Sequence, residues 1–247
     1  MTAPARQGPV ACLQLPAGPA WPDQIATLTR CTMWPMLERN QSLGEEIANS
    51  VSHGVALLGA VACVPFIVAS AWHMHAASMV GAVAFSLTMV LLYLTSTLYH
   101  ALPQGRAKSI FLKFDYAAIF LFIAGSYTPF ALGALRGPWG WALLGTIWSL
   151  AALGIALKVF ELLAHPWLST GLYLTMGWLV VVAAVPLAEH VPLPGILWLV
   201  AGGLAYTIGV VFFMLDHRIR YSHTVWHGFV AAGTGCHVVA VIGYAGT

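Results

Sequence analysis

Seven long apolar segments follow one another along this chain, separated by short polar connections. Each is about as long as the roughly 20 residues that an α-helix needs to cross the roughly 30 Å hydrocarbon core of a bilayer. Inside lipid the backbone finds no water, so a spanning segment must bond its own backbone groups by forming a helix. We therefore predict an all-α membrane protein, a bundle of seven transmembrane helices. The predicted spans are residues 47–71, 77–102, 112–135, 138–157, 167–188, 193–215 and 223–245.

The composition excludes a water-soluble domain. Of 247 residues, 60% are hydrophobic and only 7% are charged, whereas about a quarter of the residues of a soluble domain are charged. The net charge of +2 is too small to indicate a nucleic-acid partner, so the expected partners are membrane lipids, and no protein partner is predicted. The four cysteines lack CxxC or zinc-finger spacing, which supports neither a disulfide framework nor a thiolate metal site.

Residues 1–40 differ from the rest of the chain in their mixed composition, with proline, glycine and scattered charge. They lack the compact apolar region and cleavage site of a signal peptide. We interpret them as a largely disordered cytoplasmic tail that precedes the seven-helix transmembrane domain, residues 41–247. A translation start at Met33 or Met36 is a further hypothesis, which native residues 1–32 in mass spectrometry would refute.

Lysine and arginine are distributed unevenly between the two ends of the predicted spans. With the N-terminus inside, nine of the ten basic residues fall in cytoplasmic segments and only Arg136 falls outside. Cytoplasmic loops carry an excess of such residues, so we predict a cytoplasmic N-terminus and an outside C-terminus. That orientation is opposite to that of G-protein-coupled receptors, and the last span lacks the lysine that microbial rhodopsins need for retinal. The nine residues are Arg6, Arg30, Arg39, Arg106, Lys108, Lys113, Lys158, Arg218 and Arg220.

Four polar side chains fall in one layer near the cytoplasmic side, although they are far apart in the sequence. His100 lies near the inner end of the second span, and Asp115 lies near the inner start of the third. His223 and His227 lie near the inner start of the seventh. With a rise of about 1.5 Å per residue, all of them lie within about 10 Å of the cytoplasmic boundary. Ionisable groups inside spans usually mark function, so this layer is the candidate site.

The spacing of these residues is typical of a metal site. His223 and His227 are four residues apart, so both rings project from one side of a helix. Ser96 comes four residues before His100, which places its hydroxyl one turn deeper on the same face. Three imidazoles from two helices, with a carboxylate nearby, suit a tetrahedral Zn²⁺ that keeps one position open to water. The candidate zinc ligands are therefore His100, His223 and His227.

Two other interpretations of these residues remain open at this point. The side chains could be interfacial polar groups that hydrogen-bond to backbone or to lipid headgroups. They could also hold a b-type haem, which needs one histidine on each side of a flat ring. The spacing of His223 and His227 does not require that arrangement.

The first and last spans also contain polar residues outside this candidate ligand set. His53, in NSVSHG, lies in the same layer as the candidate site and could either contact it or serve a structural purpose. His237 lies ten residues beyond His227, about 15 Å further along a straight helix, and we interpret it as a packed core histidine. Glu46 and Asn49 could cap the first helix or hydrogen-bond at its end.

Four blocks of the sequence resemble those of the hemolysin III family: EEIANSVSHG, STLYHAL, KFDYAAIFLFIAGSYTPF and SHTVWHGFVAAGTGCH. That family groups with the progestin and adipoQ receptors, including the adiponectin receptors, and more distantly with the alkaline ceramidases. The resemblance covers all but the N-terminal tail and implies seven helices with a cytoplasmic N-terminus. It implies zinc held by His100, His223 and His227. It also implies that Asp115 contacts the water at the open position and that Ser96 supports the pocket.

From these residues we predict metal-assisted hydrolysis within the membrane. Zinc lowers the pKa of a bound water toward about 7. Asp115 could take the proton and deliver it to a leaving group, while Ser96 could orient Asp115 or stabilise an oxyanion. A site at helix depth suits a lipid amide or ester, and ceramide-like substrates are what the eukaryotic relatives suggest. The resemblance to a bacterial family also predicts a multi-pass protein of the bacterial inner membrane.

Two alternative functions also remain. The protein could be a non-catalytic regulator of membrane homeostasis, or a receptor-like protein, with a structural zinc whose fourth position a protein ligand closes. The family name also implies cytolysis. A pore-forming toxin normally has a secreted, water-soluble form, and this sequence indicates neither a cleavable signal nor a soluble state. We therefore expect lysis to be a consequence of overexpression or extraction.

Overall fold

The computed structural model describes residues 41–163 and 166–246. Within these ranges the chain contains helices and no strands, and seven of its helical segments are long and apolar enough to cross a membrane. The predicted fold class, a seven-helix membrane bundle, is therefore confirmed. The predicted disordered tail, residues 1–40, lies outside the described residues.

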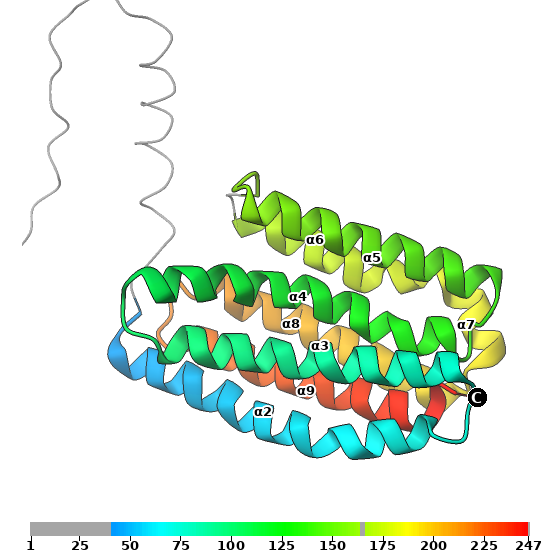
Figure 1. Cartoon of the computed structure of the whole chain (residues 1–247). Helices are drawn as coiled ribbons and strands as arrows, with labels where there is room; N and C mark the ends of the chain where they lie inside the picture. Colours follow the sequence, from blue (N-terminus) through cyan, green and yellow to red (C-terminus); the bar gives the residue numbers. More distant parts are fainter. Residues whose placement is uncertain (1–40, 164–165, 247) are drawn as a thin grey trace, which may run out of the picture. The chain divides into compact units, whose positions relative to one another are not determined.

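Figure 1 shows the helices coloured along the chain, from blue to red. Two of the spans begin earlier than hydropathy predicts, because hydropathy marks the apolar part of a helix and not its polar first turns. The first begins at Leu43 and the third at Arg106. The elements are α2 (Leu43–Ala71), α3 (Ala76–Ala101), α4 (Arg106–Leu132), α5 (Pro138–Val159), α6 (Pro166–Trp178), η1 (Leu179–Ala183), α7 (Ala184–His190), α8 (Leu193–Leu215) and α9 (Ser222–Tyr244).

The start of α2 is fixed by a capping box that also contacts the start of α9. The Glu45 backbone N–H donates to the Ser42 hydroxyl at 3.4 Å, and the Ser42 backbone N–H donates back to the Glu45 carboxylate at 2.9 Å. This exchange satisfies backbone donors that a helix start leaves free. The other Glu45 oxygen accepts the backbone N–H of Tyr221 at 3.1 Å. The first turns of α2 and α9 are therefore held together.

The fifth span is not one regular helix. It runs as α6, a 3-10 segment and then α7. The irregular part comes just before Pro186, which cannot supply the helical N–H. Tyr127 of α4 bonds to the backbone at this break. Its hydroxyl lies 2.7 and 2.8 Å from the carbonyl oxygens of Met176 and Gly177, and it accepts the Val180 N–H at 2.9 Å.

The spans pack in a closed ring. Neighbours along the chain contact one another from α2 to α6, α6 contacts α8, and α8 packs along α9. The last span then returns against the first, so α9 lies beside α2 (Figure 1). This return brings the end of α3 and the start of α9, which are far apart in the sequence, to the same place beside α2.

Glycines let α8 and α9 approach closely. A Cβ atom added at Gly202 would lie 2.4 Å from Cδ2 of His237, so the ring fills the space that this glycine leaves. The His237 ring also meets Tyr206 edge to face, with centroids 5.4 Å apart. His237 thus packs against α8, in line with its interpretation as a core histidine.

Adjacent glycines on α8 provide a matched test of this packing. We expect Gly202→Ala to lower the free energy of unfolding by about 1–3 kcal/mol, because the new methyl group collides with His237. Gly203→Ala meets its nearest atom, on Trp178, at 3.7 Å. It should be neutral or stabilising by up to about 1 kcal/mol, because alanine favours a helix. Thermal unfolding in detergent measures both, and equal stability of the two variants would contradict this packing.

The basic residues of the described chain gather at one end of the bundle. Arg106, Lys108 and Lys113 lie in the first turns of α4, and Lys158 lies in the last turn of α5. Arg218 and Arg220 lie between α8 and α9, at the same end, whereas Arg136 follows α4 at the opposite end. The uneven distribution that underlies the predicted orientation is therefore a property of the folded bundle, while the orientation itself stays a prediction.

Reporter fusions test that orientation. Alkaline phosphatase is active only outside the cytoplasm. Because positively charged loops stay in the cytoplasm, the enzyme inserted after Gln104 should be inactive, and the enzyme joined after Thr247 should be active. Green fluorescent protein becomes fluorescent in the cytoplasm but not after export in an unfolded form. It should therefore fluoresce when inserted after Gln104 and stay dark when joined after Thr247. An active phosphatase after Gln104 with an inactive one after Thr247 would reverse the assignment.

Candidate metal centre

Three histidines converge at the end of the bundle where α3 ends and α9 begins. His100 belongs to the last turn of α3, and His223 and His227 belong to the first turns of α9. One ring nitrogen of each lies within 4.8 Å of the others, close enough for the three to hold a metal ion. His100 is 4% exposed and His227 is 2% exposed, while His223 is partly buried. The structure thus brings together the three imidazoles that the sequence identifies as candidate ligands.

The rings approach one another edge to face. The ring centroids are 5.1 Å apart for His100 and His223, 5.2 Å for His100 and His227, and 4.7 Å for His223 and His227. The angles between the ring planes are 62°, 69° and 71°. No two of these rings stack on each other, so the nitrogen atoms at their edges can point toward a shared position.

The two nitrogens of His100 have different surroundings. Nδ1 lies 2.8 Å from a carboxylate oxygen of Glu46. Nε2 is buried and has no hydrogen-bond partner among the described residues. An unpaired buried nitrogen costs about 1–3 kcal/mol, and a metal ion held between the three rings would provide the missing partner. The donor set therefore fits a metal ion.

The other two candidate ligands differ in the surroundings of Nδ1. Nδ1 of His227 lies 3.0 Å from the Ser52 hydroxyl and 3.2 Å from the Asn49 carbonyl oxygen. Nδ1 of His223 lies 3.4 Å from a carboxylate oxygen of Asp216, an ion-pair distance rather than a hydrogen bond. In His100 and His227 the hydrogen-bond partners of Nδ1 leave Nε2 as the nitrogen available to the centre, an arrangement that is common for metal-bound histidine.

The two predicted catalytic residues border this centre from α3 and α4. Ser96 is buried, and its hydroxyl lies 2.7 Å from Nδ1 of His53. Asp115 is half-buried on α4. It interacts with the Ser96 side chain and, through its charge, with the His223 ring. A carboxylate on a separate helix therefore interacts electrostatically with His223 but is not grouped with the three histidines as a ligand.

A fourth histidine belongs to the same cluster. The His53 ring stacks on His227, with centroids 3.4 Å apart and planes 14° apart, and meets Tyr93 edge to face at 5.1 Å. Its Nε2 is buried and lacks a hydrogen-bond partner within the part of the chain that the structure describes. His53, which the sequence places in the same layer as the candidate site, thus contacts the candidate ligand His227 directly.

The sequence contains one signal for these neighbours and lacks another. Glu46, Asn49 and His53 recur at helical spacing in the first span, so a polar stripe facing the site could have been predicted there. Asp216 and Lys108 carry no such signal, because they stand among ordinary loop charges of the cytoplasmic segments. Only the folded chain places them beside the site.

The fold and the site together define a multi-pass membrane protein with a buried centre of three histidines near one end of a seven-helix bundle. The donors are imidazole nitrogens without thiolate, a set that suits zinc, copper, iron or nickel.

Comparison with known proteins gives the family. The family described as Haemolysin-III related matches residues 41–238, and the chain belongs to it. The chain is 40% identical over 210 residues to Hemolysin-3 of Bacillus cereus, covering 85% of this chain and 95% of that one. It is 38% identical over 204 residues to the Hemolysin-3 homolog of Bacillus subtilis (strain 168), with 82% and 95% covered. Monocyte to macrophage differentiation factor of Homo sapiens is 29% identical over 210 residues, with 81% and 84% covered. No solved structure matches significantly.

Two histidines of the same helix provide a test of the centre. We expect His227→Ala to lose bound metal, because it removes one of the three converging nitrogens. His237→Ala is the control and should keep wild-type metal content, since its ring packs against α8. Metal analysis of protein purified in detergent and equilibrated with zinc measures both. Full metal retention in folded His227→Ala would show that the three histidines do not form the binding site.

Proposed function

We propose that this protein is a zinc-dependent hydrolase of the bacterial inner membrane that cleaves a lipid amide or ester. The observation that carries the proposal is the convergence of three buried or partly buried imidazoles with Asp115 beside them on another helix. Catalytic zinc sites typically have three protein ligands and leave the fourth position for water or substrate, whereas structural sites close it with a fourth protein ligand. Among the described residues, His100, His223 and His227 form a group without a fourth member.

The donor set favours zinc over haem. Neutral imidazole nitrogens in a tetrahedral arrangement are typical zinc ligands. The three ring centroids lie between 4.7 and 5.2 Å from one another, which leaves no room for a porphyrin plane between any two of them. The haem alternative is therefore not part of the proposal.

Zinc, when bound, supplies a Lewis acid that polarises a carbonyl group and acidifies water. The chain's own contribution is proton transfer and orientation. Asp115 accepts a proton from the attacking water as the water oxygen bonds to the substrate carbonyl carbon. When the bond from that carbon to the leaving nitrogen or oxygen breaks, Asp115 returns the proton to the leaving atom. Ser96, within reach of Asp115, orients this carboxylate or stabilises the oxyanion.

The position of the centre supports a lipid substrate. The centre is built from helices that are long and apolar enough to cross a membrane, close to the end where α3 stops and α9 starts. A lipid whose amide or ester lies near the headgroup level can present its carbonyl there while its acyl chains stay in the bilayer. With the predicted orientation, this end faces the cytoplasm.

A lytic activity is the second candidate, because the relative from Bacillus cereus carries the name Hemolysin-3. The physical arguments favour hydrolysis over pore formation. The apolar spans suit permanent residence in a membrane, and a buried metal centre of three histidines is not needed to make a pore.

A substitution of Asp115 separates catalysis from metal binding. We expect Asp115→Asn to keep wild-type zinc content and to reduce product formation about 10²–10⁴-fold, because the amide cannot accept the proton. The assay follows fatty-acid release by mass spectrometry, with the purified protein in vesicles of bacterial total lipid or of lipid containing ceramide. His227→Ala should lose both zinc and hydrolysis. Undiminished hydrolysis in Asp115→Asn, or in zinc-free His227→Ala, would overturn the mechanism.

A further inference from the structure

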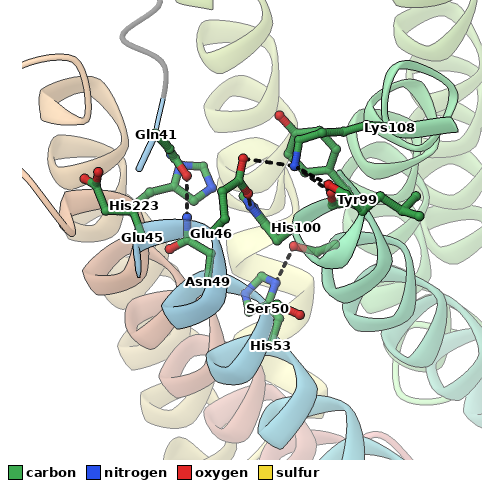
Figure 2. A network of polar contacts seen from close by, with 12 residues as sticks. Gln41, Glu45, Glu46, Asn49, Ser50, His53, Tyr99, His100, Lys108 and His223 are labelled. Carbon is green, nitrogen blue, oxygen red and sulfur yellow. Dashed lines mark hydrogen bonds and ion pairs between the residues drawn. The ribbon is translucent and has the colours of Figure 1, made fainter. Parts of the chain in front are cut away.

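Glu46 of α2 is bound through both oxygens of its carboxylate to residues of two other helices. One oxygen lies 2.8 Å from Nδ1 of His100 on α3, and the other lies 2.9 Å from the ammonium nitrogen of Lys108 on α4. Figure 2 shows Glu46 between these two side chains. The carboxylate is therefore held in place from two directions, directly behind a candidate metal ligand.

Lys108 is itself fixed. The residue is 5% exposed, and its ammonium donates to the carbonyl oxygens of Tyr99 at 2.9 Å and of Leu102 at 3.2 Å. These carbonyls lie at the end of α3, where helical partners are missing. With Glu46 as the third acceptor, all three N–H donors of the ammonium are used. Lys108 also lies over the Tyr99 ring, 4.5 Å from its centroid.

Fold stability alone gives a weak reason for this arrangement. A buried ion pair contributes little net stability, because desolvation of the two charges offsets their attraction. A carboxylate placed on Nδ1 of a histidine has a separate effect. It holds the ring proton on Nδ1, leaves the lone pair on Nε2 and makes that nitrogen a stronger ligand. Nε2 of His100 is the atom that lacks a partner among the described residues.

We propose that Glu46, held by Lys108, is the positioning residue that fixes His100 as an Nε2 ligand and sets the metal affinity of the centre. The inference rests on the metal centre of the proposed function but not on its hydrolytic step. It also distinguishes the three candidate ligands by the group that lies behind Nδ1 of each ring. His100 has a carboxylate in direct hydrogen-bond contact, whereas His223 has one at 3.4 Å and His227 has only neutral oxygens behind Nδ1.

Substitution of Glu46 tests the proposal directly. In Glu46→Gln the amide N–H₂ can donate to Nδ1 of His100 and so place the ring proton on Nε2, the wrong nitrogen for a ligand. We expect zinc affinity, measured by competition with a chelator, to fall about 10–100-fold. The absorption spectrum of the cobalt-substituted protein should change as well, which a loss of fold stability alone would not cause.

A matched control removes a carboxylate from the same end of the bundle. Glu161 pairs with Lys113 at 3.4 Å, and its side chain is 77% exposed. Glu161→Gln should keep wild-type zinc affinity and the wild-type cobalt spectrum. If Glu161→Gln lost as much affinity as Glu46→Gln, the effect would be one of general charge, and the proposal would be wrong.

Lys108 allows a second test. Lys108→Met leaves Glu46 and His100 in place but frees the carboxylate, so we expect a smaller loss of zinc affinity, of a few-fold. The double variant should bind zinc no more weakly than Glu46→Gln, because Lys108 acts on the metal only through Glu46. Additive losses would contradict this dependence. If Glu46→Gln does not fold, Lys108→Met decides: a few-fold loss supports the proposal and an unchanged affinity overturns it.

The outcomes distinguish this inference from the proposed function. If the wild-type protein binds no zinc, or if His227→Ala binds it as well as wild type does, the metal centre itself is wrong. If wild type and His227→Ala behave as expected while folded Glu46→Gln binds zinc within twofold of wild type, only the positioning role of Glu46 is wrong.

Discussion

Buried imidazole nitrogens need hydrogen-bond or metal partners, and the hydrocarbon of a membrane supplies none. At the end of the bundle where the histidines meet, other residues of the protein provide such partners. Glu46 engages Nδ1 of His100, and Ser52 and Asn49 engage Nδ1 of His227. These contacts satisfy Nδ1 of His100 and of His227. The other ring nitrogen of His100, Nε2, is buried and has no hydrogen-bond partner in the described part of the chain. A cation placed among the three rings would supply that partner, and the proposed hydrolysis depends on it.

The first span makes these contacts possible, although it supplies none of the three candidate ligands. From one face of α2, Glu46, Asn49, Ser52 and His53 each touch a histidine of α3 or α9 or the serine beside it. The capping box of α2 adds a bond to the start of α9. Because α9 returns against α2 to close the ring of helices, the first span contacts the candidate ligands of both the second and the last span.

Much of the fold could be predicted, because the membrane simplifies the problem. Lipid requires helices, apolar length gives the spans, and the depth of His100, His223 and His227 follows from their distance to a span end. The true starts of α2 and α4 were missed, because polar first turns are helical without being apolar. Asp216 and Lys108 were missed as neighbours of the site, because nothing local distinguishes a loop charge that turns inward from one that faces water.

The sequence by itself determined the number of spans, the layer in which the polar residues lie and the identity of the three converging histidines. Each of these depends on residue type and on distance along a single helix, which local physics fixes. Only the tertiary structure decided that Nε2 of His100 has no hydrogen-bond partner among the described residues, that His53 stacks on His227, and that Glu46 lies between His100 and Lys108. Those contacts depend on how helices far apart in the sequence rotate and approach one another, and packing between side chains of the whole bundle sets that arrangement.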